Sequence, residues 1–160
     1  MGLINIYTDG AAKGNPGPGG YGVVLEYNGN TKELSGGFKL TTNNRMELLA
    51  VIIGLESIKK PGHKVVVHSD SKYVVEAINQ KWVFNWEKKN YKKKKNPDLW
   101  RRFLQVYRKH EIIFKWVKGH AGHAQNERCD FLAVSASNSP NLIEDREYIA
   151  IKNNEKKLFD

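Results

Sequence analysis

The sequence contains a single cysteine, Cys129, so no disulfide can form within the chain. A chain without disulfides is typical of a reducing compartment, and we expect a cytoplasmic location. No apolar run approaches the roughly 20 residues that span a bilayer, and the N-terminus lacks a signal-peptide pattern. The sequence therefore predicts a soluble intracellular protein with no membrane partner.

Acidic residues are scarce relative to basic ones. The chain has 17 Asp and Glu against 26 Lys and Arg, which gives a formal net charge of +9. This excess favours a polyanionic partner, nucleic acid before a membrane surface, because much of it lies in one segment that also carries aromatic residues. A length of 160 residues is enough for one domain with a sizeable core, and we expect a monomer.

Hydrophobic periodicity and turn residues predict the elements of the first part of the chain. A β-prone run over 4–9 predicts a strand, and 10–20 is so rich in glycine and proline that we expect a shaped loop. Residues 21–27 and 31–38 flank Asn28-Gly29, a strong hairpin signal, so the first three strands form an antiparallel meander.

The remainder of the chain predicts helices alternating with short apolar strands. We expect a helix from the cap residues 41–44 to Pro61, helices over 71–79, 97–107 and 126–137, and strands over 64–68 and 111–117. Residues 141–160 have no persistent periodicity, and we expect a partly disordered polar tail.

Four acidic residues stand at the ends of separate predicted elements: Asp9, Glu47, Asp70 and Asp130. Carboxylates collected in this way repel one another unless a cation lies between them, so the pattern indicates a Mg²⁺ site. Local explanations remain open for three of them. Asp9 precedes glycine and could form a turn, Glu47 could close a capping box with Asn44, and Asp70 could cap the helix beginning near Ser71.

The segment 81–97 interleaves lysines with aromatic residues and is predicted to be a basic protrusion, or basic grip, that binds nucleic acid. Its candidate contacts are Trp82, Lys88, Lys89, Lys92 and Lys93. A run of lysines is usually a solvated face, and that explanation remains as the alternative.

The loop after the last strand carries two histidines. His120 lies between glycines 119 and 122 on a loop that can move, which suits proton transfer or product escort, whereas His123 is expected to be structural. A zinc site formed by His120, His123 and Cys129 is the rival interpretation, although no fourth ligand is nearby and Cys129 falls on the apolar stripe of its helix.

Several long motifs occur in one order along the chain. They are Tyr7-Thr8-Asp9-Gly10, Gly14-Asn15-Pro16-Gly17-Pro18-Gly19-Gly20-Tyr21-Gly22, Thr41-Thr42-Asn43-Asn44-Arg45-Met46-Glu47, Ser69-Asp70-Ser71-Lys72-Tyr73-Val74, Trp116-Val117-Lys118-Gly119-His120-Ala121-Gly122-His123 and Asn126-Glu127-Arg128-Cys129-Asp130. Together they closely resemble type 1 ribonuclease H of the bacterial kind, from about Leu3 to Pro140. The resemblance implies a catalytic domain over 1–140 with the α/β ribonuclease H-like fold, a mixed five-stranded sheet flanked by helices.

The resemblance also implies an activity, which is endonucleolytic hydrolysis of the RNA strand of RNA–DNA hybrids to 5′-phosphomonoester products. Two Mg²⁺ ions per site, with Mn²⁺ as a possible substitute, would be held by Asp9, Glu47, Asp70 and Asp130, and His120 matches the family's mobile catalytic histidine. Asn15, Asn43 and Asn44 match residues of hybrid recognition, Thr42 could hold a DNA phosphate, and Trp82 matches an aromatic packed on the DNA strand. Lys72 and Glu76 replace glutamines that relatives often place near the RNA, and the protrusion is shorter than in well-known relatives.

Two other functions are compatible with a basic chain of this kind. One is a catalytically silent module that binds hybrid or double-stranded RNA, since the basic grip would serve either purpose. The other is a nuclease of the same fold that acts on DNA. The full acidic set disfavours the silent module, because a binder of polyanions gains nothing by placing four negative charges on its substrate face.

Overall fold

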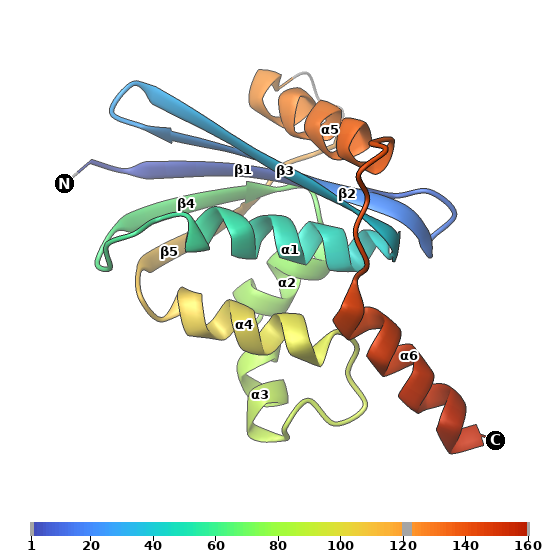
Figure 1. The fold of residues 1–160 in the computed structure, drawn as a ribbon. Coiled ribbons are helices and arrows are strands. Elements are labelled where there is room, and N and C mark those ends of the chain that lie inside the picture. Colours follow the sequence, from blue (N-terminus) through green and yellow to red (C-terminus); the bar gives the residue numbers. More distant parts are fainter. Residues whose placement is uncertain (1, 120–122, 160) are drawn as a thin grey trace.

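The computed structural model describes residues 2–119 and 123–159 and confirms the predicted mixed five-stranded sheet flanked by helices (Figure 1). The strands are β1 Ile4–Ala12, β2 Gly17–Tyr27, β3 Asn30–Thr41, β4 Lys64–Ser69 and β5 Glu111–Trp116. The helices are α1 Asn43–Glu56, α2 Lys72–Asn79, α3 Trp82–Lys88, α4 Pro97–Tyr107, α5 Ala124–Ser137 and α6 Arg146–Phe159. None of the helices in these described ranges is long and apolar enough to cross a membrane.

The sheet has the strand order β3-β2-β1-β4-β5. The first three strands are antiparallel, as expected, and Asn28 and Gly29 at the β2–β3 turn both have positive φ angles of 50° and 78°. Such angles match the tight turns whose twist suits a hairpin. β4 pairs in parallel with β1, and β5 pairs in parallel with β4. The crossover through α1 makes β4 a parallel strand covered on its faces, which accounts for the nearly continuous apolar run of β4.

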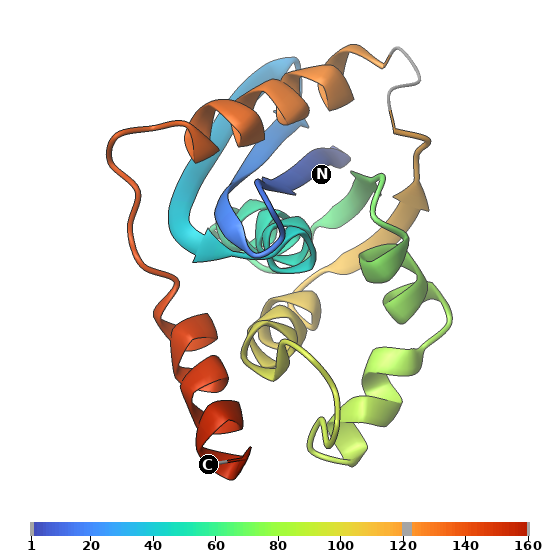
Figure 2. The ribbon, with the colours of Figure 1, turned by 90° about the vertical axis from the view of Figure 1, so that its right-hand side faces the viewer.

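Helices cover both faces of the sheet (Figure 2). α5 packs on one face against β1, β2 and β3, while α1 packs on the other and is itself covered by α4. The core between sheet, α1 and α4 contains fully buried Ile6, Ile52, Val67, Trp100 and Phe103. This core fixes β1 and α1 against each other, which matters for the carboxylates that both elements carry.

The prediction of a long loop over 10–20 was wrong, because β1 and β2 continue into it and only residues 13–16 connect them. The reason is tertiary packing. α5 lies so close to β2 that a Cβ atom at Gly20 would stand 2.4 Å from the carbonyl oxygen of Ala133. Glycine is therefore required here for close approach of a helix to a strand, although it disfavours a strand when considered locally.

The helix caps exclude two of the local explanations for the acidic residues. Thr42 caps α1 by accepting a hydrogen bond of 3.2 Å from the backbone N–H of Arg45, and Ser71 caps α2 with a 3.2 Å bond from Val74. Glu47 lies beyond the first turn of α1, so it does not close a capping box with Asn44, and Asp70 is not the cap of α2. α1 also ends at Glu56, before the stop expected at Pro61.

The segment 141–160 differs from the expected tail because it contains α6. Its approach to the helix is paired with β3, since the N–H of Lys39 donates to the carbonyl of Ile143 at 2.8 Å. Asp145, which is 7% exposed, then meets the buried guanidinium of Arg45. These long-range contacts leave no local signal in the polar sequence of the segment.

Candidate metal centre and substrate face

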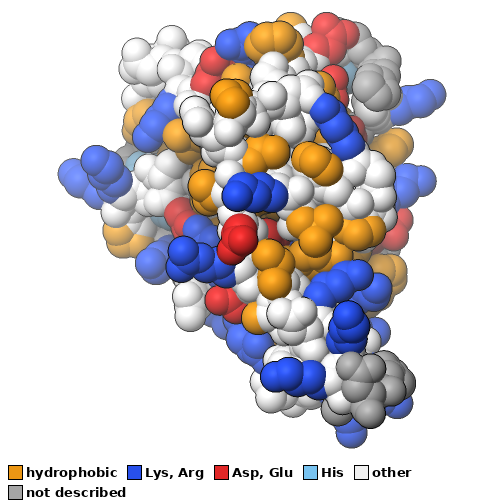
Figure 3. All heavy atoms as spheres, turned by 45° about the vertical axis from the view of Figure 1, so that its right-hand side comes forward, with side chains coloured by type: hydrophobic (Ala, Val, Ile, Leu, Met, Phe, Trp, Pro, Cys, Tyr) orange, Lys and Arg blue, Asp and Glu red, His pale blue; other side chains and the backbone are white. Residues whose placement is uncertain are grey.

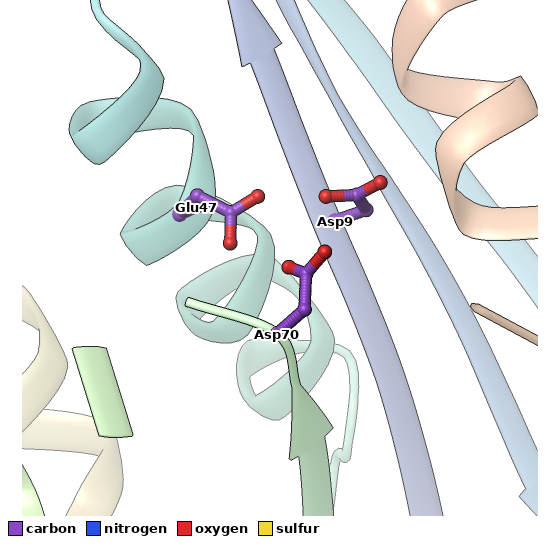
Figure 4. Close-up of side chains that lie close together, drawn as sticks. All are labelled: Asp9, Glu47 and Asp70. Atoms are coloured by element: carbon purple, nitrogen blue, oxygen red, sulfur yellow. The ribbon is translucent and has the colours of Figure 1, made fainter. Parts of the chain in front are cut away.

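Three acidic side chains from separate elements converge at one edge of the sheet (Figure 4). Thr8 on β1 pairs with Ser69 on the parallel strand β4, so the residues that follow them, Asp9 and Asp70, are neighbours. Glu47 reaches them from α1, and one carboxylate oxygen from each of the three lies within 4.8 Å of the others. The structure thus brings together three of the four predicted ligands as one cluster.

Asp130, the fourth predicted ligand, lies beside this cluster on α5. It lines a small hollow of about 60 Å³ together with Asp9 and Asp70. Its negative charge is one of those that raise the pKa of Asp9. His123 and Glu127 line the same hollow, and sequence reasoning did not predict a place for Glu127 there.

Gly10 aligns two of the carboxylates. Its backbone N–H donates to Oδ1 of Asp9 at 2.9 Å and to Oε1 of Glu47. A Cβ atom at this position would stand 2.3 Å from the backbone nitrogen of Glu47, so only glycine permits this approach of β1 to α1. The Asp-Gly pair therefore lies within β1 and serves the cluster, and the explanation of Asp9 as a turn residue was wrong.

The cluster is electrostatically unfavourable when it holds only carboxylates. Burial, together with the neighbouring charges of Asp70 and Asp130, raises the pKa of Asp9 to about 6. Burial, the contact with Asp9 and the charge of Asp70 raise the pKa of Glu47 well above its ordinary value. Within the described ranges no donor reaches the buried Oε2 atom of Glu47. Buried polar atoms normally have partners, so this oxygen and its acidic neighbours fit a hard divalent cation such as Mg²⁺.

The rival zinc site receives no support from Cys129. Its side chain, on α5, is fully buried, and burial together with the charge of Asp9 raises the pKa of the thiol to about 12. A zinc ligand is a thiolate, which this environment disfavours. His120 lies outside the described residues, and His123 is an exposed residue at the start of α5.

The predicted recognition residues gather at the N-terminal end of α1, next to the carboxylates. The side-chain oxygen of Asn43 accepts from the N–H of Ala12, and that of Asn15 accepts from the N–H of Asn43 at 2.9 Å. These bonds join the 13–16 connection to α1 and leave both side-chain amides on exposed residues. Thr42 and the exposed Asn44 complete this surface.

The basic segment forms α3 and the connection to α4, which project at the lower end of the molecule in Figure 1. The lysines Lys88, Lys89, Lys92, Lys93, Lys94 and Lys95 are all exposed. The aromatic residues divide: Trp82 is 47% exposed, whereas Tyr91 is buried and the ring of Trp86 lies 5.6 Å from that of Trp100. Among these three, only Trp82 is exposed, and the other two anchor the segment to the core.

Two features near the site were missed by sequence reasoning. The indole N–H of Trp116 donates to the backbone carbonyl of Asp70 at 3.2 Å, and Nζ of Lys72 lies 5.3 Å from the same ring. Trp116 is the last residue of β5, and 46% of its surface is exposed. An aromatic residue at the end of an apolar strand was the signal in the sequence that could have indicated it. The second feature is the ion-pair network of Arg45, which had no signal in the sequence.

The fold, a mixed sheet with acidic residues gathered at the carboxyl ends of β1 and β4, defines an α/β protein of the ribonuclease H-like class. A family model described as RNase H matches residues 2–138, so the chain belongs to the RNase H family. The match ends before α6, which begins at Arg146.

The chain is similar to curated relatives over nearly their full length. The chain is 56% identical over 144 residues to "Ribonuclease H" of Desulforamulus reducens, covering 87% of this chain and 90% of the relative. It is 53% identical over 150 residues to "Ribonuclease H" of Rippkaea orientalis, covering 91% of each. The predicted family, type 1 ribonuclease H, is confirmed.

Solved structures show the same fold. LC9-RNase H1, described as a type 1 RNase H with the type 2 active-site motif, has a TM-score of 0.77 and 35% identity, covering 86% of this chain and 73% of that one. LC11-RNase H1, solved in complex with an RNA/DNA hybrid, has a TM-score of 0.66 and 31% identity, covering 84% and 96%.

Proposed function

We propose that this chain is a ribonuclease H that cleaves the RNA strand of RNA–DNA hybrids internally, with divalent metal ions held by Asp9, Glu47, Asp70 and Asp130. The observation that carries the proposal is the convergence of three carboxylates within 4.8 Å in a member of the RNase H family. The hybrid bound to LC11-RNase H1 supports the choice of substrate.

Asp9 and Glu47 have distinct parts in holding the ions. Asp9 meets Glu47 and Asp70 in the cluster and lines the hollow with Asp130, so it is the candidate for a ligand shared by two ions. Glu47 is held through Oε1 by Gly10, which leaves Oε2 for coordination. When bound, two Mg²⁺ or Mn²⁺ ions would supply the positive charge that lowers the pKa of the attacking water and offsets the charge developing on the phosphate.

Proton transfer and substrate contact fall to other residues. We assign to His120 the transfer of a proton or the escort of product, since it stands between glycines 119 and 122 in the sequence. Asn15, Asn43 and Asn44 present amides that can donate to and accept from a ribose 2′-OH, the group that distinguishes RNA from DNA. Thr42 would hold a DNA phosphate, Trp82 would pack on the DNA strand, and Lys88, Lys89, Lys92 and Lys93 would bind backbone phosphates.

The test uses labelled hybrid, duplex RNA, duplex DNA and single strands, each with Mg²⁺ and with chelator. We expect cleavage of the RNA strand of the hybrid alone, only with Mg²⁺, and with 5′-phosphate ends. Asp9→Asn should abolish cleavage and keep or improve hybrid binding, because it removes a ligand and lessens repulsion with phosphate.

Glu56→Gln is the matched control, since it also removes one carboxylate but lies in an exposed ion pair with Arg102. It should cleave as the unmodified chain does. Near-normal turnover by Asp9→Asn would refute the metal assignment. Binding of hybrid without cleavage by the unmodified chain would instead favour the silent module, and cleavage of duplex DNA would favour a DNA nuclease. We further propose a monomeric, cytoplasmic enzyme, and the mass of the hybrid complex in solution tests the first of these.

A further inference from the structure

A groove of about 340 Å³ runs beside the substrate face, and one of its walls is α6. The N-terminal end of α1 contributes Thr42 and Asn44, and the connection before α4 contributes Lys94 and Lys95. From α6, the groove receives Lys152 and Glu155. The groove therefore continues the surface proposed for hybrid recognition onto a helix that lies beyond the RNase H family match.

α6 is tied to this surface by a buried network. Arg45, on the first turn of α1, is 1% exposed and donates from Nε to Asp145 at 2.8 Å. The Thr41 hydroxyl also donates to Asp145 at 2.8 Å, and the carboxylate accepts from the backbone N–H of Tyr148 at 3.3 Å. A second carboxylate, that of Asp98, accepts hydrogen bonds from both terminal nitrogens of Arg45. The first turn of α6 is therefore anchored to the same end of α1 that carries Thr42.

This anchor gives Lys152 a defined place. Its Nζ atom lies 5.7 Å from the centre of the Tyr148 ring, and Tyr148 is itself buried against Arg45. Lys152 is exposed, and within the described part of the chain it makes no ion pair. The space-filling view shows Lys and Arg side chains spread over the lower part of the molecule, where α6 lies (Figure 3).

We propose that α6 extends the nucleic-acid interface and that Lys152 binds a backbone phosphate of the hybrid, opposite Lys94 and Lys95 across the groove. Three lysines and one glutamate give the groove a net positive charge, and its neutral members Thr42 and Asn44 offer hydroxyl and amide groups. Such a lining suits a phosphodiester backbone, which is contacted by lysines and by neutral polar groups. This inference rests on the proposed function, because it assigns a further binding residue to the same substrate.

Lys152→Gln tests the proposal in an Asp9→Asn background, where hybrid binding can be measured with Mg²⁺ present. We expect the Kd for the hybrid to rise about three- to tenfold, and the slope of log Kd against log salt to flatten by roughly 0.7–0.9, the share of one phosphate contact. In the active chain KM should rise while kcat at saturating hybrid stays unchanged, because uniform binding is lost.

Two further variants separate charge in the groove from general effects. Lys157→Gln removes the same charge from the same helix at a position that does not line this groove, and it should leave Kd and the salt slope close to those of the parent. Glu155→Gln removes a negative charge from the groove wall and should tighten binding, about twofold or more.

The outcomes distinguish this inference from the function on which it rests. If Lys152→Gln matches Lys157→Gln in Kd and salt slope while the active chain cleaves hybrid, α6 is not part of the interface. Weaker binding by Glu155→Gln would also overturn the proposal, because it would show damage to the helix and not an effect of charge. Failure of the unmodified chain to cleave hybrid would overturn the proposed function itself.

Discussion

Glu47 has two carboxylate oxygens in different surroundings. Oε1 accepts a hydrogen bond from Gly10, whereas Oε2 is buried with no donor among the described residues. An ionised carboxylate left in this state costs free energy, which a bound cation would recover. The residues that suit the chemistry are therefore the ones that strain the metal-free protein.

The free-energy cost of the buried carboxylates can be measured at Asp9 through the pH dependence of stability. Its pKa is raised from 3.8 to about 6, chiefly by burial, so its contribution to stability is fully present below pH 3.8 and is lost as pH rises through about 6. In the metal-free protein, Asp9→Asn should remove this loss and raise the free energy of unfolding at pH 7 by about 1–3 kcal/mol. Denaturant unfolding without divalent ions at pH 4 and pH 7 measures the effect.

The raised pKa of Glu47 has the same sign and belongs to the same cluster, so some pH dependence should persist in the Asp9→Asn protein. The difference between the two proteins should be small at pH 4 and larger at pH 7. Parallel stability curves over this range would show that burial does not raise the pKa of Asp9.

His120 is assigned a role in proton transfer and not in metal binding. His120→Ala should slow turnover by roughly 10²–10⁴-fold, the range for lost acid–base assistance. Metal binding should persist, because the four carboxylates are unchanged. Single-turnover kinetics and a Mg²⁺ titration of thermal stability check the two parts, and loss of Mg²⁺ binding would instead indicate that His120 is a ligand.

At the scale of elements, α3 and the connection to α4 act as a charged appendage whose inward aromatic rings hold it in place. Replacing Lys92, Lys93, Lys94 and Lys95 with glutamine should weaken hybrid binding, raise KM and flatten the salt dependence, since each lost phosphate contact removes its share of counterion release. Turnover at saturating hybrid should change little. Steady-state kinetics over a range of salt concentrations measures these effects.

Trp82→Ala is the comparison for that prediction. Trp82 is the exposed indole at the start of α3, so its loss should weaken binding in a manner less sensitive to salt, through contact area and not charge. If the variant that replaces the four lysines keeps the KM and salt slope of the unmodified chain, the lysines form only a solvated surface and do not contact the hybrid.

The attachment of α6 depends on a buried ion pair. Asp145→Asn leaves the guanidinium of Arg45 with the carboxylate of Asp98 alone, and breaking a buried pair in this way should cost roughly 2–4 kcal/mol of unfolding free energy. Glu56→Gln is the control, because its pair with Arg102 is exposed and should contribute about 0–1 kcal/mol. Chemical denaturation compares the two, and equal losses would contradict a structural role for the buried network.

At the scale of the whole molecule, the proposed metal ligands come from β1, α1, α5 and the end of β4, so they are close together only in the folded chain. A ligand that binds the folded state alone stabilises it by mass action. Mg²⁺ at about 100 times its Kd should add about 2.7 kcal/mol, which corresponds to a rise in Tm of roughly 5–10 °C for a domain of this size. Calorimetry with and without chelator measures the rise, and Asp9→Asn should reduce it.

Most of the fold and the acidic site could be predicted from the sequence because their signals are local. The β-prone run before Asp9, the hairpin at Asn28-Gly29 and the cap residues before α1 each reflect backbone preferences over a few residues. The four acidic residues were recognisable because each lies within a motif of the family, although Asp9 lies inside β1 and Asp130 in the middle of α5.

Other features depended on contacts between distant parts of the chain. Gly20 reads as a loop residue until α5 packs on it, and Trp86 reads as a stacking surface until its ring meets that of Trp100. Asp145 lies in a polar stretch that becomes the anchor of α6 only when Arg45, 100 residues away, reaches it. Propensity and periodicity describe the chain near each residue, whereas burial and ion pairing depend on neighbours that only the folded chain supplies.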